Sequence, residues 1–145
     1  MKNYIGGLIC LMLFLTGCNY NDRLLADKKL NIELELTEDY DDHEPFIDER
    51  LFCVSEDIKS LTLNVSLQLD GENGILEIAD NQTGEVLWDN SWQDVINNAK
   101  FDISLNKLKK DKEYVIRFTG SMIKYARIVV TCNSDIIKER ERPMK

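Results

Sequence analysis

Few residues of this chain belong to types that support covalent catalysis. The only histidine, His43, stands in an acidic stretch from Glu38 to Glu49 that contains seven acids and no base. A hydrolytic triad needs a nucleophile, a base and a group that orients the base, and no rigid scaffold is predicted around His43. The 26 acidic residues of the chain make some close carboxylate pairs inevitable, so such pairs are uninformative. We therefore expect no catalytic residue and no cofactor.

The same acidic stretch offers oxygen atoms that calcium favours. The candidate ligands in this loop, 38–49, are Glu38, Asp39, Asp41, Asp42, Asp48 and Glu49. The ligand ladder and central glycine of an EF-hand are absent. A solvated loop of mutually repelling charges is the favoured alternative, and we predict no metal site.

The N-terminus has the order of charges and apolar residues that a secretory signal requires. Lys2 supplies a positive start, Ile5 to Leu15 an apolar segment, and Thr16-Gly17 small residues next to a cysteine, Cys18. The apolar segment has eleven residues, whereas a membrane-spanning helix needs about 20. An export signal is therefore predicted rather than a membrane span.

Leu15-Thr16-Gly17-Cys18 resembles the lipobox of bacterial lipoproteins. The resemblance implies that the thiol of Cys18 carries a diacylglyceryl group, as in palmitate-bearing lipoproteins, and that cleavage before Cys18 makes it the first mature residue. Two or more acyl chains give stable anchoring. The implied location is the bacterial cell membrane on its extracytoplasmic side. Because Asn19 takes the place of a retention aspartate, the outer membrane is the alternative in a Gram-negative host.

Charge and length divide the chain into four parts. We predict a cleaved signal at 1–17, a lipidated tether at 18–29, a folded domain at 30–137 and a charged tail at 138–145. The formal net charge of -8 argues against a nucleic-acid partner. Residues 100–145 carry 12 bases against 6 acids, whereas residues 61–99 carry 7 acids and no base. These charges either intermix in the fold, which we favour, or form a basic end facing lipid or cell wall and an acidic end facing outward.

Once Cys10 is removed with the signal and Cys18 is lipidated, two thiols remain. Cys53 and Cys132 would lie in an oxidising compartment, where disulfides persist. A bridge would close a loop of about 80 residues and contribute about 4 kcal/mol in the chain-entropy model. We predict this disulfide, with two buried unbridged thiols as the alternative.

The elements that carry these residues are short strands. Apolar and polar residues alternate from Leu30 to Leu36 and, most clearly, from Leu61 to Leu69, and weaker alternation predicts further strands at 51–54, 75–79, 86–88, 101–105, 114–118 and 126–132. Asp70-Gly71-Glu72-Asn73-Gly74 predicts a hairpin turn, Asp80 to Gly84 a second turn, and Thr119-Gly120-Ser121 a strand break. Residues 93–100 are predicted to be irregular or one helical turn. Seven or eight short strands predict an all-β sandwich.

The stretch from Leu108 to Tyr114, continuing to Phe118, resembles the tyrosine corner of immunoglobulin-like and fibronectin type III domains. The resemblance implies that Leu108 packs inward and that the Tyr114 hydroxyl bonds back to the backbone of the corner. The proline of the fibronectin motif is replaced by Lys110. It implies a small immunoglobulin-like β-sandwich and no particular function.

Trp88 and Trp92 are the aromatic residues with most scope for recognition. They either contact a partner through exposed rings or, as is more common, cover an open end of the core. The chain as a whole predicts a membrane-anchored, non-enzymatic interaction module that binds an envelope protein or a cell-wall polymer. The alternative is a small envelope hydrolase or an accessory subunit of an envelope enzyme.

Overall fold

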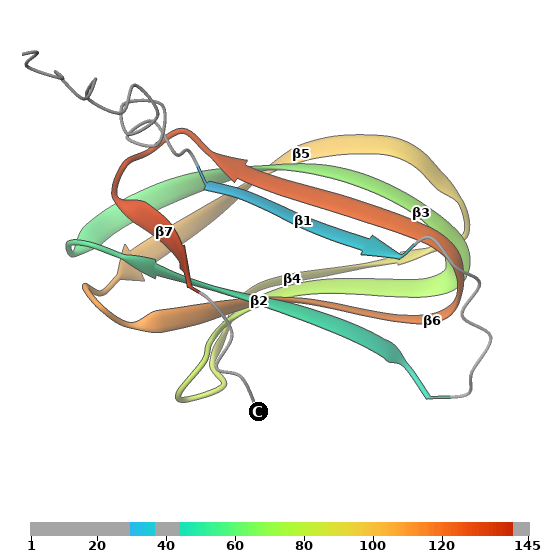
Figure 1. Ribbon diagram of the computed structural model, residues 1–145, viewed down its shortest axis with the longest axis horizontal. Coiled ribbons are helices and arrows are strands. Elements are labelled where there is room, and N and C mark those ends of the chain that lie inside the picture. The colour runs from blue at the N-terminus through green and yellow to red at the C-terminus, as the bar shows by residue number, and fades with distance from the viewer. Residues whose placement is uncertain (1–29, 37–43, 141–145) are drawn as a thin grey trace, which may run out of the picture.

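The computed structural model describes residues 30–36 and 44–140. These residues form an all-β fold of seven antiparallel strands (Figure 1): β1 (Leu30–Leu36), β2 (Phe46–Val54), β3 (Ile58–Asp80), β4 (Val86–Gln93), β5 (Ile96–Leu108), β6 (Glu113–Cys132) and β7 (Ile137–Arg140). The prediction of an all-β sandwich is confirmed.

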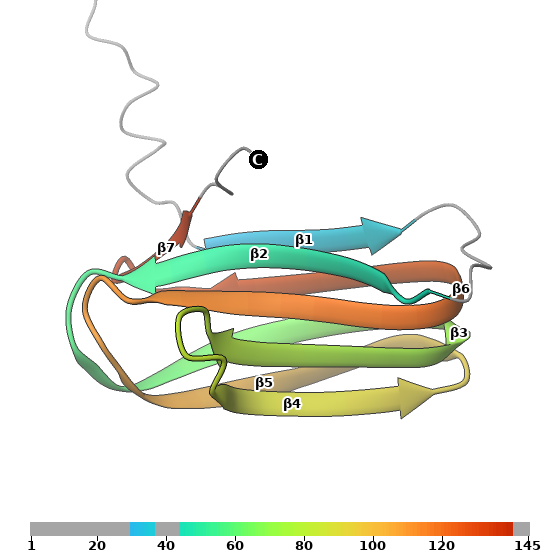
Figure 2. The same ribbon diagram turned by 90° about the horizontal axis from the view of Figure 1, so that it is seen from below.

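Two long strands, β3 and β6, belong to both layers of this sandwich. They pair with each other from Asn64 to Asp80 of β3, and both bend midway. The first layer has the order β5, β3, β6, β1, and the second has the order β4, β3, β6, β2, β7. Figure 2 looks onto the second layer, with the first layer behind it. The layers are therefore two halves of one hydrogen-bonded sheet.

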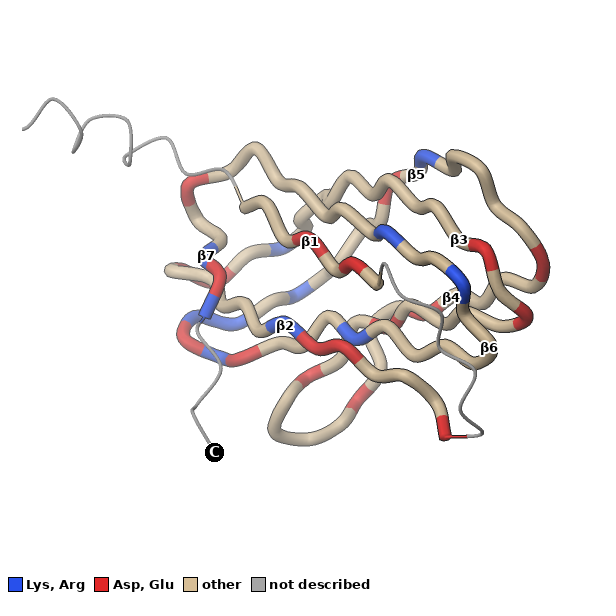
Figure 3. Tube along the Cα trace, turned by 45° about the vertical axis from the view of Figure 1, so that its right-hand side comes forward, with Lys and Arg blue, Asp and Glu red and all other residues tan. Residues whose placement is uncertain are grey.

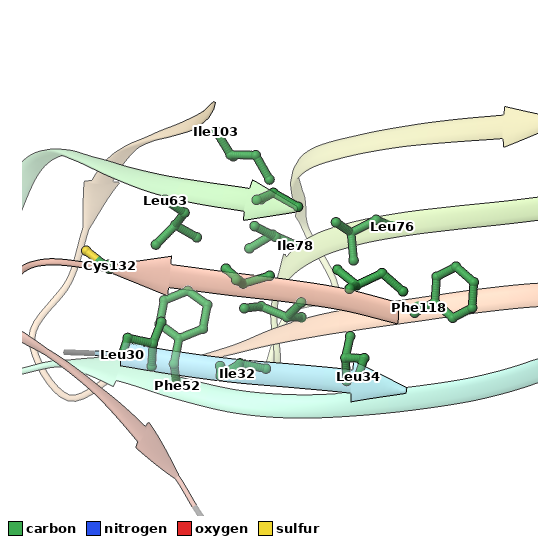
Figure 4. Packing of buried hydrophobic residues seen from close by; sticks show 14 of the residues in the cluster. Leu30, Ile32, Leu34, Phe52, Leu63, Leu76, Ile78, Ile103, Phe118 and Cys132 are labelled. Atoms are coloured by element: carbon green, nitrogen blue, oxygen red, sulfur yellow. The ribbon is translucent and has the colours of Figure 1, made fainter. Parts of the chain in front are cut away.

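Alternation along the strands places one set of side chains between the layers. Leu63 and Leu67 of β3 are fully buried, while their neighbours Thr62 and Asn64 are exposed. Figure 4 shows side chains from both layers meeting in this core, among them Leu30, Ile32, Leu34, Phe52, Leu63, Leu76, Ile78, Ile103, Phe118 and Cys132. Burial of one such side chain contributes about 1.5–3 kcal/mol. The alternation in the sequence places many apolar side chains in this core, and their burial is the main stabilising interaction.

The two ends of the sandwich close in different ways. At one end, called the turn end, the chain reverses in turns at 55–57, 81–85, 109–112 and 133–136. At the other, called the bend end, β3 and β6 continue from one layer into the other. The bend end comprises 70–74 of β3, 119–123 of β6, the 94–95 connection and residues 44–47, which the strand register brings together.

Two predicted interruptions are wrong, and both lie at the bend end. Asp70 to Gly74 is no hairpin turn, because β3 runs through it, and Thr119 to Ser121 does not break β6. Each segment finds its hydrogen-bond partners in the other, with only a register shift between Asp70 and Gly71. The turn-forming residues therefore bend a strand rather than reverse it.

The glycines at the bend allow close packing. A β-carbon at Gly71 would lie 2.6 Å from Cδ1 of Ile123, and one at Gly120 would lie 2.8 Å from the same side chain. Real β-carbons essentially never approach other atoms this closely. The two glycines let the backbones of β3 and β6 approach Ile123 where the sheet folds over.

Three further boundaries differ from the predictions. The predicted loop at 38–49 is strand from Phe46 onward, and residues 37–43 lie outside the described residues. Residues 96–100, predicted to be irregular, belong to β5. The predicted tail begins too early, because residues 138–140 belong to β7, which pairs with β2. In each case pairing with a distant strand supplies order that the local sequence does not indicate.

Candidate binding surfaces

The two cysteines of the domain are free thiols, so the predicted disulfide is not formed. Cys132 packs into the core between the layers, and its thiol donates a hydrogen bond to the carbonyl oxygen of Thr62 at 3.5 Å. Burial raises the pKa of Cys132. Cys53 follows the core residue Phe52 in β2 and therefore points to the opposite side of its layer. There its sulfur accepts a hydrogen bond from Nε of Arg140 at 3.2 Å. The alternative of two buried thiols describes this arrangement.

Several predicted site residues lie outside the described residues. They are Cys18, His43 and the acids from Glu38 to Asp42. Within 30–36 and 44–140 no cluster of three or more His, Cys, Asp or Glu side chains is arranged to hold a metal ion. The same residues include no helix of sufficient length and hydrophobicity to cross a membrane.

The residues of the tyrosine corner join β5 to β6 at the turn end. The hydroxyl of Tyr114 accepts a hydrogen bond from the backbone N–H of Lys109 at 2.8 Å, as the resemblance implies. Leu108 and Tyr114 are both buried, and the Tyr114 ring stacks on Phe52 with centroids 5.4 Å apart. The motif here fixes the crossing between the two layers.

An ion pair between buried Asp80 and partly exposed Lys112, which the sequence does not indicate, holds a neighbouring turn. Asp80 is the one buried charged residue among those described. Its Oδ1 accepts hydrogen bonds from the backbone N–H groups of Gln82 and Thr83 at 2.9 and 3.1 Å, and its Oδ2 accepts one from Nζ of Lys112 at 2.7 Å. The Lys112 ammonium and these two N–H groups lower the pKa of Asp80 to about 2. Asp80 thereby ties the β3–β4 turn to the β5–β6 turn.

Trp88 and Trp92 cover the open side of the core between β4 and β5, which do not pair with each other. Both rings are half-buried and lie against Phe101 of β5, with centroid separations of 5.9 and 5.6 Å. They occupy the inward positions of β4, opposite Ile78 and Gly74 of β3. Of the two predicted roles, the geometry is that of a cover for the core.

The outer face of the second layer carries a charged row. Arg117 of β6 donates to Glu49 of β2 and to Glu77 of β3, at 2.6 Å in each case. The pKa of Arg117 is raised, chiefly by the hydrogen bond to Glu49. These residues are partly exposed, and such pairs contribute little to stability. The two ion pairs hold the Arg117 guanidinium between Glu49 and Glu77 on this face.

Exposed apolar side chains gather at the bend end. Among the described residues, five large apolar side chains are strongly exposed: Ile47 (54%), Ile75 (40%), Val86 (47%), Val95 (57%) and Met122 (41%). Ile47 and Ile75 flank Thr119 on adjacent strands, and Met122 and Val95 occupy the bend of β6 and the β4–β5 connection. Val86 alone stands at the start of β4, toward the turn end. Four of the five therefore lie at one end. A group of exposed apolar residues is uncommon on a soluble domain and often marks a binding surface.

Met122 also has an unusual backbone. Its φ of +51° lies in the left-handed region, which an unbranched apolar residue rarely adopts. A strained, exposed apolar residue is a feature that marks functional sites. Asp70, Glu72 and Asp94 belong to the same segments of the bend end, and Lys124 follows directly on β6. Acidic positions at this end appear in red in Figure 3.

The comparisons with known proteins give a family without an assigned activity. No curated protein matches the chain. A domain of unknown function, DUF4624, matches residues 18–144, which is most of the chain. The chain therefore belongs to the DUF4624 family.

Proposed function

We propose that the protein is a lipid-anchored, non-enzymatic interaction module of the bacterial envelope that docks a partner protein at its bend end. The observation that supports this proposal is the gathering of Ile47, Ile75, Val95 and Met122 at the end opposite the entry of the chain into β1. The anchor is the diacylglyceryl group expected on Cys18.

The proposed anchor joins the domain at one particular end. β1 begins at Leu30, which pairs with Cys132 at the turn end. Between Cys18 and Leu30 the chain spans at most about 40 Å when fully extended. In an anchored molecule the tether therefore joins the domain at its turn end, within about 40 Å of the membrane, and the bend end is the end farther from the attachment point.

The chemistry of the bend end specifies the partner. Isolated exposed apolar residues are normal, but a group of them framed by charges is typical of a protein contact. The frame here is acidic, with Asp70, Glu72 and Asp94 against Lys124, and the chain as a whole has a formal charge of -8. A protein that presents an apolar contact surrounded by Lys and Arg matches this surface, and electrostatic attraction would accelerate their association.

Photo-crosslinking of the full-length protein in the bacterium that produces it tests this proposal. A photoreactive amino acid is placed at Val95 or Met122 and, as the matched control, at Val86, which is also exposed and apolar but belongs to the turn end of β4. We expect one protein to be captured from the first two positions and not from Val86. Equal capture from all three, or none, would overturn docking at the bend end.

Purified components then establish that the captured protein binds this surface. Val95→Asp should weaken binding of the purified partner about tenfold or more, and Val86→Asp should leave it unchanged. Met122→Gly removes an apolar contact while relieving the left-handed strain, so that it should weaken binding with no loss of thermal stability. The anchor is tested separately, because Cys18→Ser should release the protein from membranes. A variant that stays bound and processed would refute the lipobox.

A further inference from the structure

The outer face of the first layer contains a groove, lined by both polar and apolar groups, that the proposed docking at the bend end does not use. It has a volume of about 410 Å³ and crosses β5, β3 and β6. Its exposed lining comprises Asn64, Ser66, Lys100, Asp102, Val129 and Thr131. The sequence does not indicate that these residues lie together, because they come from three separate segments of the chain.

The strand register arranges the lining in two rows. Asp102, Asn64 and Thr131 lie opposite one another on adjacent strands and form the first row. Lys100, Ser66 and Val129 form the second row in the same way. Because paired residues of adjacent strands lie about 5 Å apart, each row presents three side chains over roughly 10 Å. Small side chains in the centre, Ser66 above all, leave the space that makes the groove.

One hydrogen bond organises the polar groups in advance. Nδ2 of Asn64 donates to Oδ1 of Asp102 at 2.8 Å. This contact holds a planar amide beside a planar carboxylate. Within the described part of the chain the amide oxygen of Asn64 and Oδ2 of Asp102 have no other hydrogen-bond partner. The pair therefore offers donors and acceptors to a ligand with little loss of side-chain entropy.

The charge and polarity of the groove select among ligands. Lys100 and Asp102 balance each other, so the groove has no field that would attract a polyanion or a polycation. Amide, carboxylate, ammonium and hydroxyl groups together can satisfy hydroxyl groups, each of which donates and accepts. The methyl groups of Val129 and Thr131 offer an apolar contact for C–H surfaces. A sugar ring has both features, because it carries hydroxyl groups around its edge and C–H groups on its faces.

We infer that this groove binds an uncharged saccharide chain. Asn64 and Asp102 would bind ring hydroxyl groups together, Lys100 and Thr131 would contact the neighbouring sugar, and Val129 would pack under a ring face. Phe101 contributes to the lining, but its ring lies against Trp88 and Trp92 on the inner side of β5, so no aromatic ring of the described residues is placed to stack on a ligand in the groove. Binding by hydrogen bonds alone is weak for one molecule, but a membrane surface that carries many anchored copies gains from multivalency.

Calorimetric titration of the full-length lipoprotein in detergent micelles tests the inference. The probes are two neutral oligosaccharides, chitotetraose and cellotetraose, and an anionic one of the same length, tetragalacturonate. We expect a neutral probe to bind, and Asp102→Ala and Asn64→Ala each to weaken that binding at least tenfold. The control is Asp89→Ala, which removes an equally exposed carboxylate from the edge strand of the other layer and should leave the affinity unchanged.

Every other outcome contradicts the inference. Absence of binding by both neutral probes would overturn it, as would binding that Asp102→Ala and Asn64→Ala leave intact. Tighter binding of tetragalacturonate would overturn the uncharged class of ligand. Ser66→Arg fills the centre of the groove without removing a polar partner and should also abolish binding, so that the result does not depend on one type of variant. Failure here leaves docking at the bend end untouched, because the two proposals use different residues.

Discussion

The turn end and the bend end solve the same problem, closing a two-layered sheet, by different physical means. At the turn end the backbone reverses, and specific polar side chains satisfy the groups that the reversal exposes. Asp80 accepts two backbone N–H groups there, and Tyr114 accepts a third. At the bend end β3 and β6 keep their backbone hydrogen bonds to each other. The close packing at Gly71 and Gly120 lets the two strands fold over there.

This difference indicates which residues can be substituted without a large loss of stability. The turn end uses its polar side chains internally, so that changing them costs stability. At the bend end Ile47, Val95 and Met122 are exposed, so substituting them should cost little stability. If the proposed function is correct, recognition belongs to the bend end and much of the stability to the turn end, and each end then predicts its own response to substitution.

The largest effect is expected from the tyrosine corner. Leu108→Ala removes a fully buried side chain and should lower the free energy of unfolding by about 2–5 kcal/mol. Tyr114→Phe leaves the Lys109 N–H without its acceptor and should cost about 1–3 kcal/mol. Urea unfolding monitored by circular dichroism measures both. Val95→Ala at the bend end is the control and should change stability by less than about 0.5 kcal/mol. A loss from Val95→Ala as large as that from Leu108→Ala would contradict the prediction that this exposed side chain of the bend end contributes little to stability.

A smaller effect is expected from the glycine at the bend. Gly71→Ala places a methyl group 2.6 Å from Ile123 and 2.9 Å from the carbonyl oxygen of Met122, and should destabilise the protein by about 1–3 kcal/mol. Gly84 at the turn end differs, because a β-carbon there meets no atom within 4 Å and its φ is +73°. Asn tolerates that conformation, so Gly84→Asn should be nearly neutral while Gly71→Asn should cost more than Gly71→Ala. The same urea titration decides. Equal costs for the two Asn variants would show that the bend is not governed by close packing.

The sequence predicts the turn end better than the bend end, for a physical reason. The turn from Asp80 to Gly84 and the spacing of Leu108 and Tyr114 depend on residues close together in the chain, and both have the predicted structure. The alternation from Leu61 to Leu69 likewise specifies a buried face directly. Such features depend on local backbone geometry and hydrophobic period, which short sequences contain.

The bend and the groove depend on pairings that no short segment contains. Asp70 to Gly74 has the composition of a hairpin turn, and only its pairing with residues 119–123 shows it to be strand. Asn64 and Asp102 are 38 residues apart and become partners through the β3–β5 register. The disulfide prediction failed similarly, because the alternation that points Cys53 away from the core becomes apparent only when Phe52 is seen to face inward. Distant pairing, not composition, determines these sites.

The smallest effect concerns acid, and it should appear at the turn end. The folded pKa of Asp80 is about 2, below its usual value of 3.8, and the Lys110 N–H and the Lys109 ammonium lower the pKa of Asp57 at the same end. A carboxyl group whose pKa is lowered by folding stabilises the native state above its unfolded pKa, and this contribution is lost as the pH falls through the folded pKa. The melting temperature of the protein should therefore exceed that of Asp80→Asn at pH 5 and above, and the gap should narrow between about pH 4 and pH 2. Asp89→Asn, which changes an exposed carboxylate on β4, serves as the control for the substitution and should lower the melting temperature at pH 7 less than Asp80→Asn does. A gap for Asp80→Asn that stayed constant down to pH 2 would mean that the Asp80–Lys112 contact does not hold the turn end through its charge, and the distinction between the two ends would then rest on packing alone.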